Sequence, residues 1–514
     1  MTTNEWLAIA PFLIVSGLAI LVVVVDMIRP GNDRLATLVG VVGVLAAMVA
    51  TVWAGPIGGL GDVPAIGQLP EGGTAVFGGV YVRDEMTSFL DLLFLGITLL
   101  TILFAPDYLR PRRLPVAEFI SVLLFAVSGA MLLGAGRDLL ILFLGLELLV
   151  LPGYLLAGFA KRDGLSTEGA IKYFLLGSFS SAILLFGLVF VFGYTGSTNV
   201  DVIAERLTGI VGGYAPFPLA LGMGMALVLA GAAFKIAAVP FHYWTPDAYQ
   251  GSPTPVTGYL SVGPKVAALA LVLRLFADAM GPLAEEWYLI VGVLAAITMT
   301  VGNLAALGQD NIKRMLAYSS IAHTGYIMVG LTVFGGSSDP EVQAAGVQGI
   351  LFYGFAYAVM NLGAFACVAA LQRRPGVTSQ ISSFAGLGRR APLLGVAMTL
   401  FLLSLVGIPP TAGFLAKAVI VLGAIEGGGY LPVLAVIVML NATAAAFYYL
   451  RVVVTMYMRE PAENAKPVEI GGLTRAGLVL AAVATIAIGL LPAVTGAALD
   501  ITEKAAQTVV TADR

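Results

Sequence analysis

The sequence predicts an all-α polytopic membrane protein of about fourteen transmembrane helices, with two inverted five-helix repeats that each contain a broken helix. Three observations support this fold class. Of the 514 residues, 59% are hydrophobic and only 11% are charged, whereas soluble chains carry about 25% charged residues. Apolar stretches of about 17–25 residues, long enough to cross a bilayer, recur along nearly the whole chain. Two of these stretches, 218–240 and 391–425, have a lysine close to a proline at which the helix is expected to break.

The apolar stretches set the helix boundaries in chain order. They predict helices over 6–28, 35–54, 86–106, 115–134, 138–160, 168–194, 218–240, 255–278, 287–308, 315–334, 346–371, 391–425, 431–458 and 472–495. The first stretch follows no basic segment and has no small-residue cleavage site, so we expect a retained helix. The span 391–425 is too long for one straight helix and contains Pro409-Pro410, so we expect a break there. The span 218–240 is expected to break at Pro240.

The basic residues between the spans predict the orientation. With the N-terminus outside, the cytoplasmic loops would hold Arg29, Arg34, Arg110, Arg112, Arg113, Lys161, Arg162, Lys313, Arg314, Arg373, Arg374, Arg389, Arg390, Arg459, Lys466 and Arg475. The opposite side would hold Arg83, Arg137, Arg206, Arg274, Lys504 and Arg514. This bias follows the positive-inside rule, so both termini are expected on the outer side. The Pro/Gly-rich segment 55–80 is expected to be an outer loop.

Several classes of function are excluded by composition. A net charge of -3 does not favour nucleic acid as a partner. The single cysteine, Cys367, cannot form a disulfide or an iron–sulfur cluster within the chain, and two histidines leave little material for haem or metal sites. We therefore expect no cofactor on this chain.

Among the ionisable residues inside predicted spans, Glu147, Lys235, Lys265, His323 and Lys417 lie deep within long apolar runs. A charge at the bilayer centre costs at least about 2.5–3.5 kcal/mol on insertion scales, so it usually has a partner or a function. One interpretation is that Glu147 pairs with one lysine and only fixes helix packing. However, one acid cannot neutralise three lysines. Burial favours the neutral amine and an approaching carboxylate favours the ammonium, so a Glu–Lys pair that opens and closes can load and release a proton.

The two proline breaks are related by symmetry in this interpretation. Lys235 precedes Pro240, whereas Lys417 follows Pro409-Pro410, and the two helices run in opposite directions. Each lysine therefore lies on the same side of its break, as in transporters built from inverted repeats. Two unrelated kinks are the simpler alternative. The expected segments are helices 1–3 in 1–114, a first repeat in 115–278, an inverted repeat in 287–458, and a last helix with a short tail in 459–514.

Three long segments, 234–255, 311–326 and 407–417, strongly resemble the antiporter-like subunits of respiratory complex I, the proton-pumping NADH:quinone oxidoreductase. The resemblance covers about residues 85 to 460. Within that family, the segment 168–181 and Lys417 resemble the N-type subunit, which is subunit 2 in mitochondrial naming; the M-type subunit usually has a glutamate at the position of Lys417.

The resemblance implies a role for each membrane-embedded charge. Glu147 and Lys235 would form the pair that gates proton entry. Lys265 would relay the proton, His323 would bridge toward the exit, and Lys417 would be the terminal donor.

Lys172 is a weaker candidate near the Glu147–Lys235 pair, since a lysine at a helix end can instead extend to the interface. FMN, iron–sulfur clusters and quinone are expected in partner subunits, and M-type and K-type subunits are the expected membrane neighbours. The composition and the absence of a transit peptide favour a bacterial cytoplasmic membrane. The rival hypotheses are a subunit of a multisubunit sodium/proton antiporter, a membrane subunit of a hydrogenase, and a purely structural role.

Overall fold

Helices account for nearly all of the computed structural model, which describes residues 2–55, 73–211, 217–461 and 468–511. Within these ranges, eleven helical segments are long and apolar enough to cross a membrane. They are α1 (Thr3–Ile28), α2 (Asp33–Ala54), α3 (Glu85–Leu109) with η2 (Arg110–Arg112), α4 (Val116–Ala135), α5 (Leu139–Ala157), α6 (Gly164–Thr195), α10 (Thr254–Val272) with the π-helical turn η3 (Leu273–Ala279), η4 (Gly281–Leu283) with α11 (Ala284–Leu307), α13 (Pro340–Leu371), α17 (Leu431–Met458) and α18 (Gly472–Leu490).

The other helices are shorter or more polar. They are α7 (Val200–Val211), α8 (Leu219–Lys235), α9 (Trp244–Gly251), α12 (Ile312–Gly335), η5 (Ile381–Phe384), α14 (Leu387–Arg390), α15 (Pro392–Val406), α16 (Ala412–Glu426) and α19 (Pro492–Thr511). The prediction of an all-helical membrane protein is confirmed at this level.

The two predicted helix breaks are present. Helix α8 ends at Lys235, and the chain becomes helical again only at Trp244, where α9 begins. Between α15 and α16 the chain is non-helical over 407–411. Buried backbone groups at such breaks need hydrogen-bond partners. At the first break, Thr324 donates to the carbonyl of Ile236 (2.7 Å), and Thr298 accepts from the amide of Val239 (3.0 Å). Side chains of α11 and α12 therefore stabilise the first break.

The C-terminal segment corrects one prediction. Instead of a short tail after the last span, the chain forms the twenty-residue helix α19, and α18 ends at Leu490 because Pro492 begins the new helix. The apolar residues of α19 lie on one face, where Ala505, Ala506 and Val509 are buried against the bundle. Mean hydropathy does not detect an amphipathic helix of this kind. Helix α7 was missed for the same reason.

Part of the predicted outer loop 55–80 is a small hairpin. Strand β1 (Thr74–Val76) pairs antiparallel with β2 (Tyr81–Arg83) across η1 (Phe77–Gly79). Gly78 and Gly79 have positive φ, which suits the tight turn. The rest of that loop, 56–72, lies outside the described residues.

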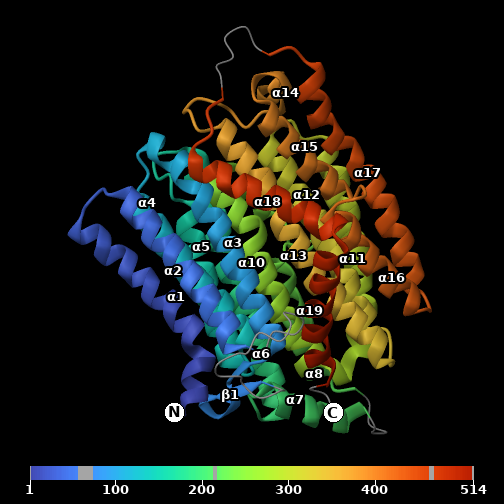
Figure 1. Ribbon diagram of the computed structural model, residues 1–514. Helices are drawn as coiled ribbons and strands as arrows, with labels where there is room; N and C mark the ends of the chain where they lie inside the picture. Colours follow the sequence, from blue (N-terminus) through green and yellow to red (C-terminus); the bar gives the residue numbers. More distant parts are fainter. Residues whose placement is uncertain (1, 56–72, 212–216, 462–467, 512–514) are drawn as a thin grey trace.

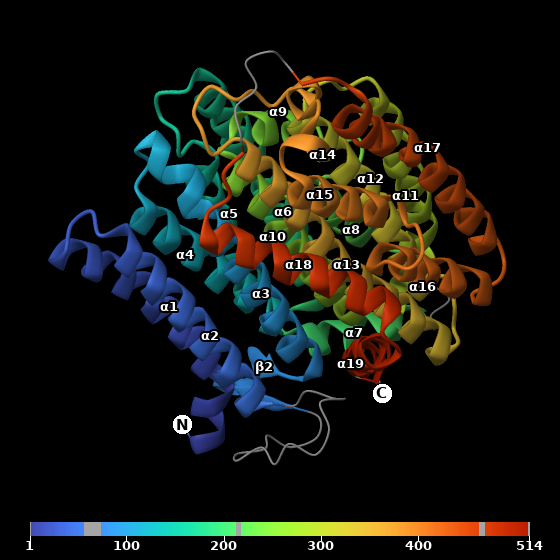
Figure 2. The ribbon, with the colours of Figure 1, turned by 45° about the horizontal axis from the view of Figure 1, so that its top comes forward.

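The helices form one bundle with both chain ends at the same end of the molecule (Figure 1). Helices α1 and α2 lie together at one flank, and α18 crosses obliquely over α3 and α13 (Figure 2). Every residue of α10 is buried, as is nearly all of α12. Because α10, α12 and α13 form the centre of the bundle, polar side chains on them lie far from the lipid-facing surface.

Candidate functional site

Lys235 lies at the first helix break. It is the last residue of α8 and is 7% exposed. Its Nζ donates to Ser181 Oγ (2.7 Å) and to the carbonyl of Gly177 (3.2 Å), both on α6. These acceptors are neutral, so among the described residues the ammonium is solvated by the protein without a counter-charge in direct contact.

Lys265 lies at the centre of the bundle on α10 and is 3% exposed. Its Nζ donates to both the carbonyl and the hydroxyl of Ser320 on α12, each at 2.6 Å. The same carbonyl accepts a bond from Thr324 Oγ1 (3.2 Å), and Thr324 also donates to Ile236 at the first break. A short polar connection therefore runs from Lys265 along α12 to the residue after Lys235.

His323 continues this polar face of α12. Its side chain is 1% exposed and lies between two tyrosine hydroxyls: Nδ1 is 2.8 Å from Tyr353 and Nε2 is 3.3 Å from Tyr449. Tyr449 in turn contacts the hydroxyl of Ser319. Because each ring nitrogen faces a hydroxyl that can donate or accept, the imidazole can exchange its proton between the two sides by changing tautomer.

Lys417 lies in the second turn of α16, directly after the second break. It is 5% exposed, and its Nζ donates to the carbonyls of Leu405 (2.7 Å) and Val406 (2.9 Å) at the end of α15. The last carbonyls of a helix have no partner within it and carry partial negative charge. The Lys417 amine also lies 5.4 Å from the ring centroid of Tyr326, whose ring contacts His323. The broken helix therefore supplies the acceptors that hold the lysine.

Glu147 lies on α5 and is partly buried. Its Oε1 is buried and has no hydrogen-bond partner among the described residues. Over the same part of the chain no ion pair within 4.0 Å joins it to Lys235, whose ammonium is bound by Ser181 and Gly177 instead. The pair expected from the sequence is thus near but separated in this conformation.

Lys172 has a different environment from the other lysines. Its side chain is 42% exposed and forms ion pairs with Glu168 (2.6 Å) and Asp247 (2.7 Å). Asp247 also binds Arg314 of α12 at 2.7 Å. These contacts tie α6, α9 and α12 together and favour the interfacial interpretation of Lys172.

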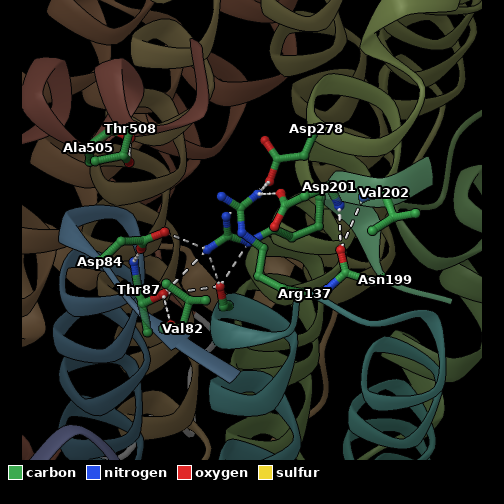
Figure 3. A network of polar contacts seen from close by, with 12 residues as sticks. Val82, Asp84, Thr87, Arg137, Asn199, Asp201, Val202, Asp278, Ala505 and Thr508 are labelled. Atoms are coloured by element: carbon green, nitrogen blue, oxygen red, sulfur yellow. Dashed lines mark hydrogen bonds and ion pairs between the residues drawn. The ribbon is translucent and has the colours of Figure 1, made fainter. Parts of the chain in front are cut away.

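A second buried charge group lies at the end of the bundle that holds the chain termini. Arg274, in the π-helical turn, is fully buried and donates to Asp84, to Asp278 and to the carbonyl of Gly134, all at 2.8–3.1 Å. Arg137 also binds Asp278, at 2.6 Å (Figure 3). We call Asp84, Arg137, Arg274 and Asp278 the Arg274 cluster. A cavity of about 740 Å³ adjoins it, lined in part by Arg137 and Asp278.

The comparisons with known proteins agree with this architecture. The model of the NADH:quinone oxidoreductase/Mrp antiporter transmembrane family matches residues 136–443. The NADH-quinone oxidoreductase subunit N of Chloroflexus aggregans is 42% identical over 487 residues, and the match covers 94% of each chain. The chain belongs to the NADH-quinone oxidoreductase subunit N family.

Solved structures extend the similarity of this subunit N family member. A chain in the structure of respiratory complex I from Thermus thermophilus with bound aureothin is 30% identical, with a TM-score of 0.73, and the match covers 94% of this chain and 97% of that one. A chain of the Mrp complex from Dietzia sp. has a TM-score of 0.80 at 22% identity, covering both chains fully. The second likeness shows the fold alone.

The Arg274 cluster of this subunit N chain was missed by sequence reasoning, which placed Arg83, Arg137 and Arg274 among the outer-side charges. Arg83 and Arg274 are fully buried, and Arg137 is 7% exposed. One signal was present: Arg274 and Asp278 are four residues apart in a predicted span, the spacing of a helical ion pair. The remaining partner, Asp84, lies 190 residues away, and only the fold reveals it.

Proposed function

We propose that this chain, as the antiporter-like subunit N of NADH:quinone oxidoreductase, moves protons across the membrane through its central lysines. The observation that carries this proposal is the environment that Lys235, Lys265 and Lys417 share. Each is at least 93% buried and is bound by neutral oxygens. A lysine held in this way can become a neutral amine without leaving an unpaired carboxylate beside it, so it can accept and release a proton.

The proposed route follows the polar contacts. Glu147 and Lys235 receive the proton at the first break, and their approach and separation change the charge that Lys235 prefers. Lys265 accepts it through the polar groups of α12. His323 passes it between hydroxyls, and Lys417 at the second break is the terminal donor. Lys172, with its exposed ion pairs, is assigned a tethering role on this route.

The repeat architecture belongs to the same proposal. Fourteen spans result when α12, the broken pair α8–α9 and the broken pair α15–α16 are added to the eleven long segments. The lysine and its break recur in opposite order in the two halves, which supports a first repeat over 115–278 and an inverted repeat over 287–458. The flanking segments are 1–114 and 459–514.

The location and partners follow from subunit N membership and charge. We place the chain in a bacterial cytoplasmic membrane with both termini on the periplasmic side, because the basic loops lie at the opposite end. M-type and K-type subunits would be its neighbours in the membrane. FMN, the iron–sulfur clusters and quinone would belong to partner subunits. Quinone reduction in those subunits would supply the free energy for moving protons across the membrane.

The rival function is sodium/proton exchange, as a subunit of a multisubunit antiporter. The fold likeness to the Mrp chain is compatible with it, because the two families share this fold. The higher identity of the subunit N relative, 42% against 22% for the Mrp chain, favours the redox-linked enzyme.

The proposal is tested in the intact complex reconstituted in vesicles. Glu147→Gln and Lys265→Ala are compared with wild type for NADH:quinone reduction, proton uptake and co-purification of the other subunits. We expect assembly to be kept and proton transfer to fall by at least about tenfold, because positioned proton-transfer groups typically contribute 10²–10⁴-fold. Normal proton transfer in both variants would support a purely structural role. Sodium-dependent proton movement without redox activity would support the antiporter.

A further inference from the structure

Two buried oxygens on α5 have no hydrogen-bond partner within the described part of the chain: Oε1 of Glu147 and the hydroxyl of Tyr154. These residues are seven positions apart, which is two helical turns, so they lie on the same face of α5. Side chains on a helix lean toward its N-terminus, and the Tyr154 phenol therefore extends back toward Glu147.

The Tyr154 hydroxyl also lies against the residue that binds Lys235. A Cβ atom added to Gly177 would be 2.1 Å from the phenol oxygen, so that oxygen occupies the space a side chain would need. The carbonyl of Gly177 accepts the bond from Lys235 Nζ. The phenol oxygen thus lies beside the residue whose carbonyl binds Lys235, on a side chain that shares the face of α5 with Glu147.

Packing explains the ring of Tyr154 but not its hydroxyl. The ring is in edge-to-face contact with Tyr173 (4.6 Å between centroids) and Phe174 (5.6 Å). Phenylalanine would make both contacts equally well. An unsatisfied buried polar group destabilises a protein, so a hydroxyl at this position indicates a function that the packing does not require.

We propose that Tyr154 relays the proton between Glu147 and Lys235. In the forward step, protonated Glu147 gives its proton to the phenol oxygen while the phenol gives its own proton to the neutral amine of Lys235. The products are a carboxylate, an unchanged phenol and an ammonium, so no oxidant or further reactant is required. This inference rests on the proposed function, because it deepens the gate formed by Glu147 and Lys235.

The test is Tyr154→Phe in the intact complex, with Glu147→Gln as the reference and Tyr430→Phe as the matched control. Tyr430 also has a buried hydroxyl without a partner in the described chain, but it lies at the start of α17, away from the lysines. Proton uptake is measured per NADH oxidised in vesicles. We expect Y154F to lower it about tenfold with assembly kept, and Y430F to stay within about twofold.

Gly177→Ala is the second variant, because its methyl group would displace the phenol oxygen while Tyr154 remains. We expect it to lower proton uptake in the same way, and to add little when combined with Y154F. Normal proton uptake in Y154F and G177A, with uptake lost in E147Q, would overturn the relay and leave the proposed function standing. Normal uptake in E147Q as well would overturn the gate itself.

Discussion

The central lysines and the Arg274 cluster are buried in the same helical bundle, yet their charges are paired in different ways. Lys265 is bound by the carbonyl and hydroxyl of Ser320. Arg274 is bound by two aspartates, Asp84 and Asp278, at 3.0 Å each. The first arrangement stabilises an amine in either protonation state, whereas the second requires a permanent positive charge.

This difference matches the chemistry of the two side chains. The arginine guanidinium stays protonated at any physiological pH and presents a rigid fork of donors, whereas a buried lysine changes its charge readily. The bundle therefore separates two tasks. The Arg274 cluster joins α3, α4 and the end of α10 through fixed charges, and the lysines at and between the helix breaks are available to change charge. Four predictions test that separation.

The largest effect is expected for Arg274→Leu. It would leave Asp84 buried without its arginine partner and Asp278 with Arg137 alone, and breaking a buried ion pair in this way costs about 3–5 kcal/mol. We expect little or no subunit in the assembled complex, measured as the amount that co-purifies and its thermal stability. Arg389→Leu is the control, since that arginine forms an exposed pair with Glu460 and exposed pairs contribute only about 0–1 kcal/mol. An R274L complex as stable as wild type would contradict the fixed-charge role.

The second prediction concerns Lys265→Arg, which keeps the positive charge but prevents its loss. We expect an assembled complex in which proton transfer falls by more than about tenfold, because the guanidinium does not deprotonate. Proton uptake and subunit content are measured together, and Lys504→Arg is the control at an exposed helix position. If K265R pumped normally, a fixed charge would suffice at this position, and the contrast with Arg274 would fail.

A smaller effect is expected for His323→Asn. The amide keeps a donor and an acceptor near Tyr353 and Tyr449 but cannot carry a proton from one to the other. Water can carry part of this proton transfer, so we expect proton uptake to fall by only about fivefold. This loss is smaller than the usual contribution of a general acid–base catalyst. The readout is uptake per NADH oxidised. An unchanged ratio would assign His323 a packing role only.

The spans and the lysines could be predicted from the sequence because both signals are local. A run of apolar residues identifies a span by itself, and a charge within it is conspicuous since it is so costly there. The breaks near Pro240 and Pro410 were likewise predicted from residues next to each other in the chain. Helix α19 was not predicted, because its burial depends on contacts with α3 and α13.

The partners of the site residues could not be predicted, because they come from distant parts of the chain. Lys265 meets Ser320 across 55 residues, and His323 meets Tyr449 across 126. Nothing in the local sequence distinguishes these hydroxyls from others in the same helices. The sequence therefore locates the groups that can change charge, and the fold determines which neighbours they exchange protons with.

The smallest effect is expected for Lys172→Met, and it sharpens the comparison because this lysine resembles the Arg274 cluster in its pairing. Its ammonium is bound by two carboxylates, but at 42% exposure, where ion pairs contribute about 0–1 kcal/mol. Asp247 would keep its bond to Arg314. We expect proton uptake within about twofold of wild type, measured at low and at high salt. A loss as large as that of K265R would show that exposure and carboxylate pairing do not separate structural lysines from those that carry protons, and Lys172 would then join the proton route.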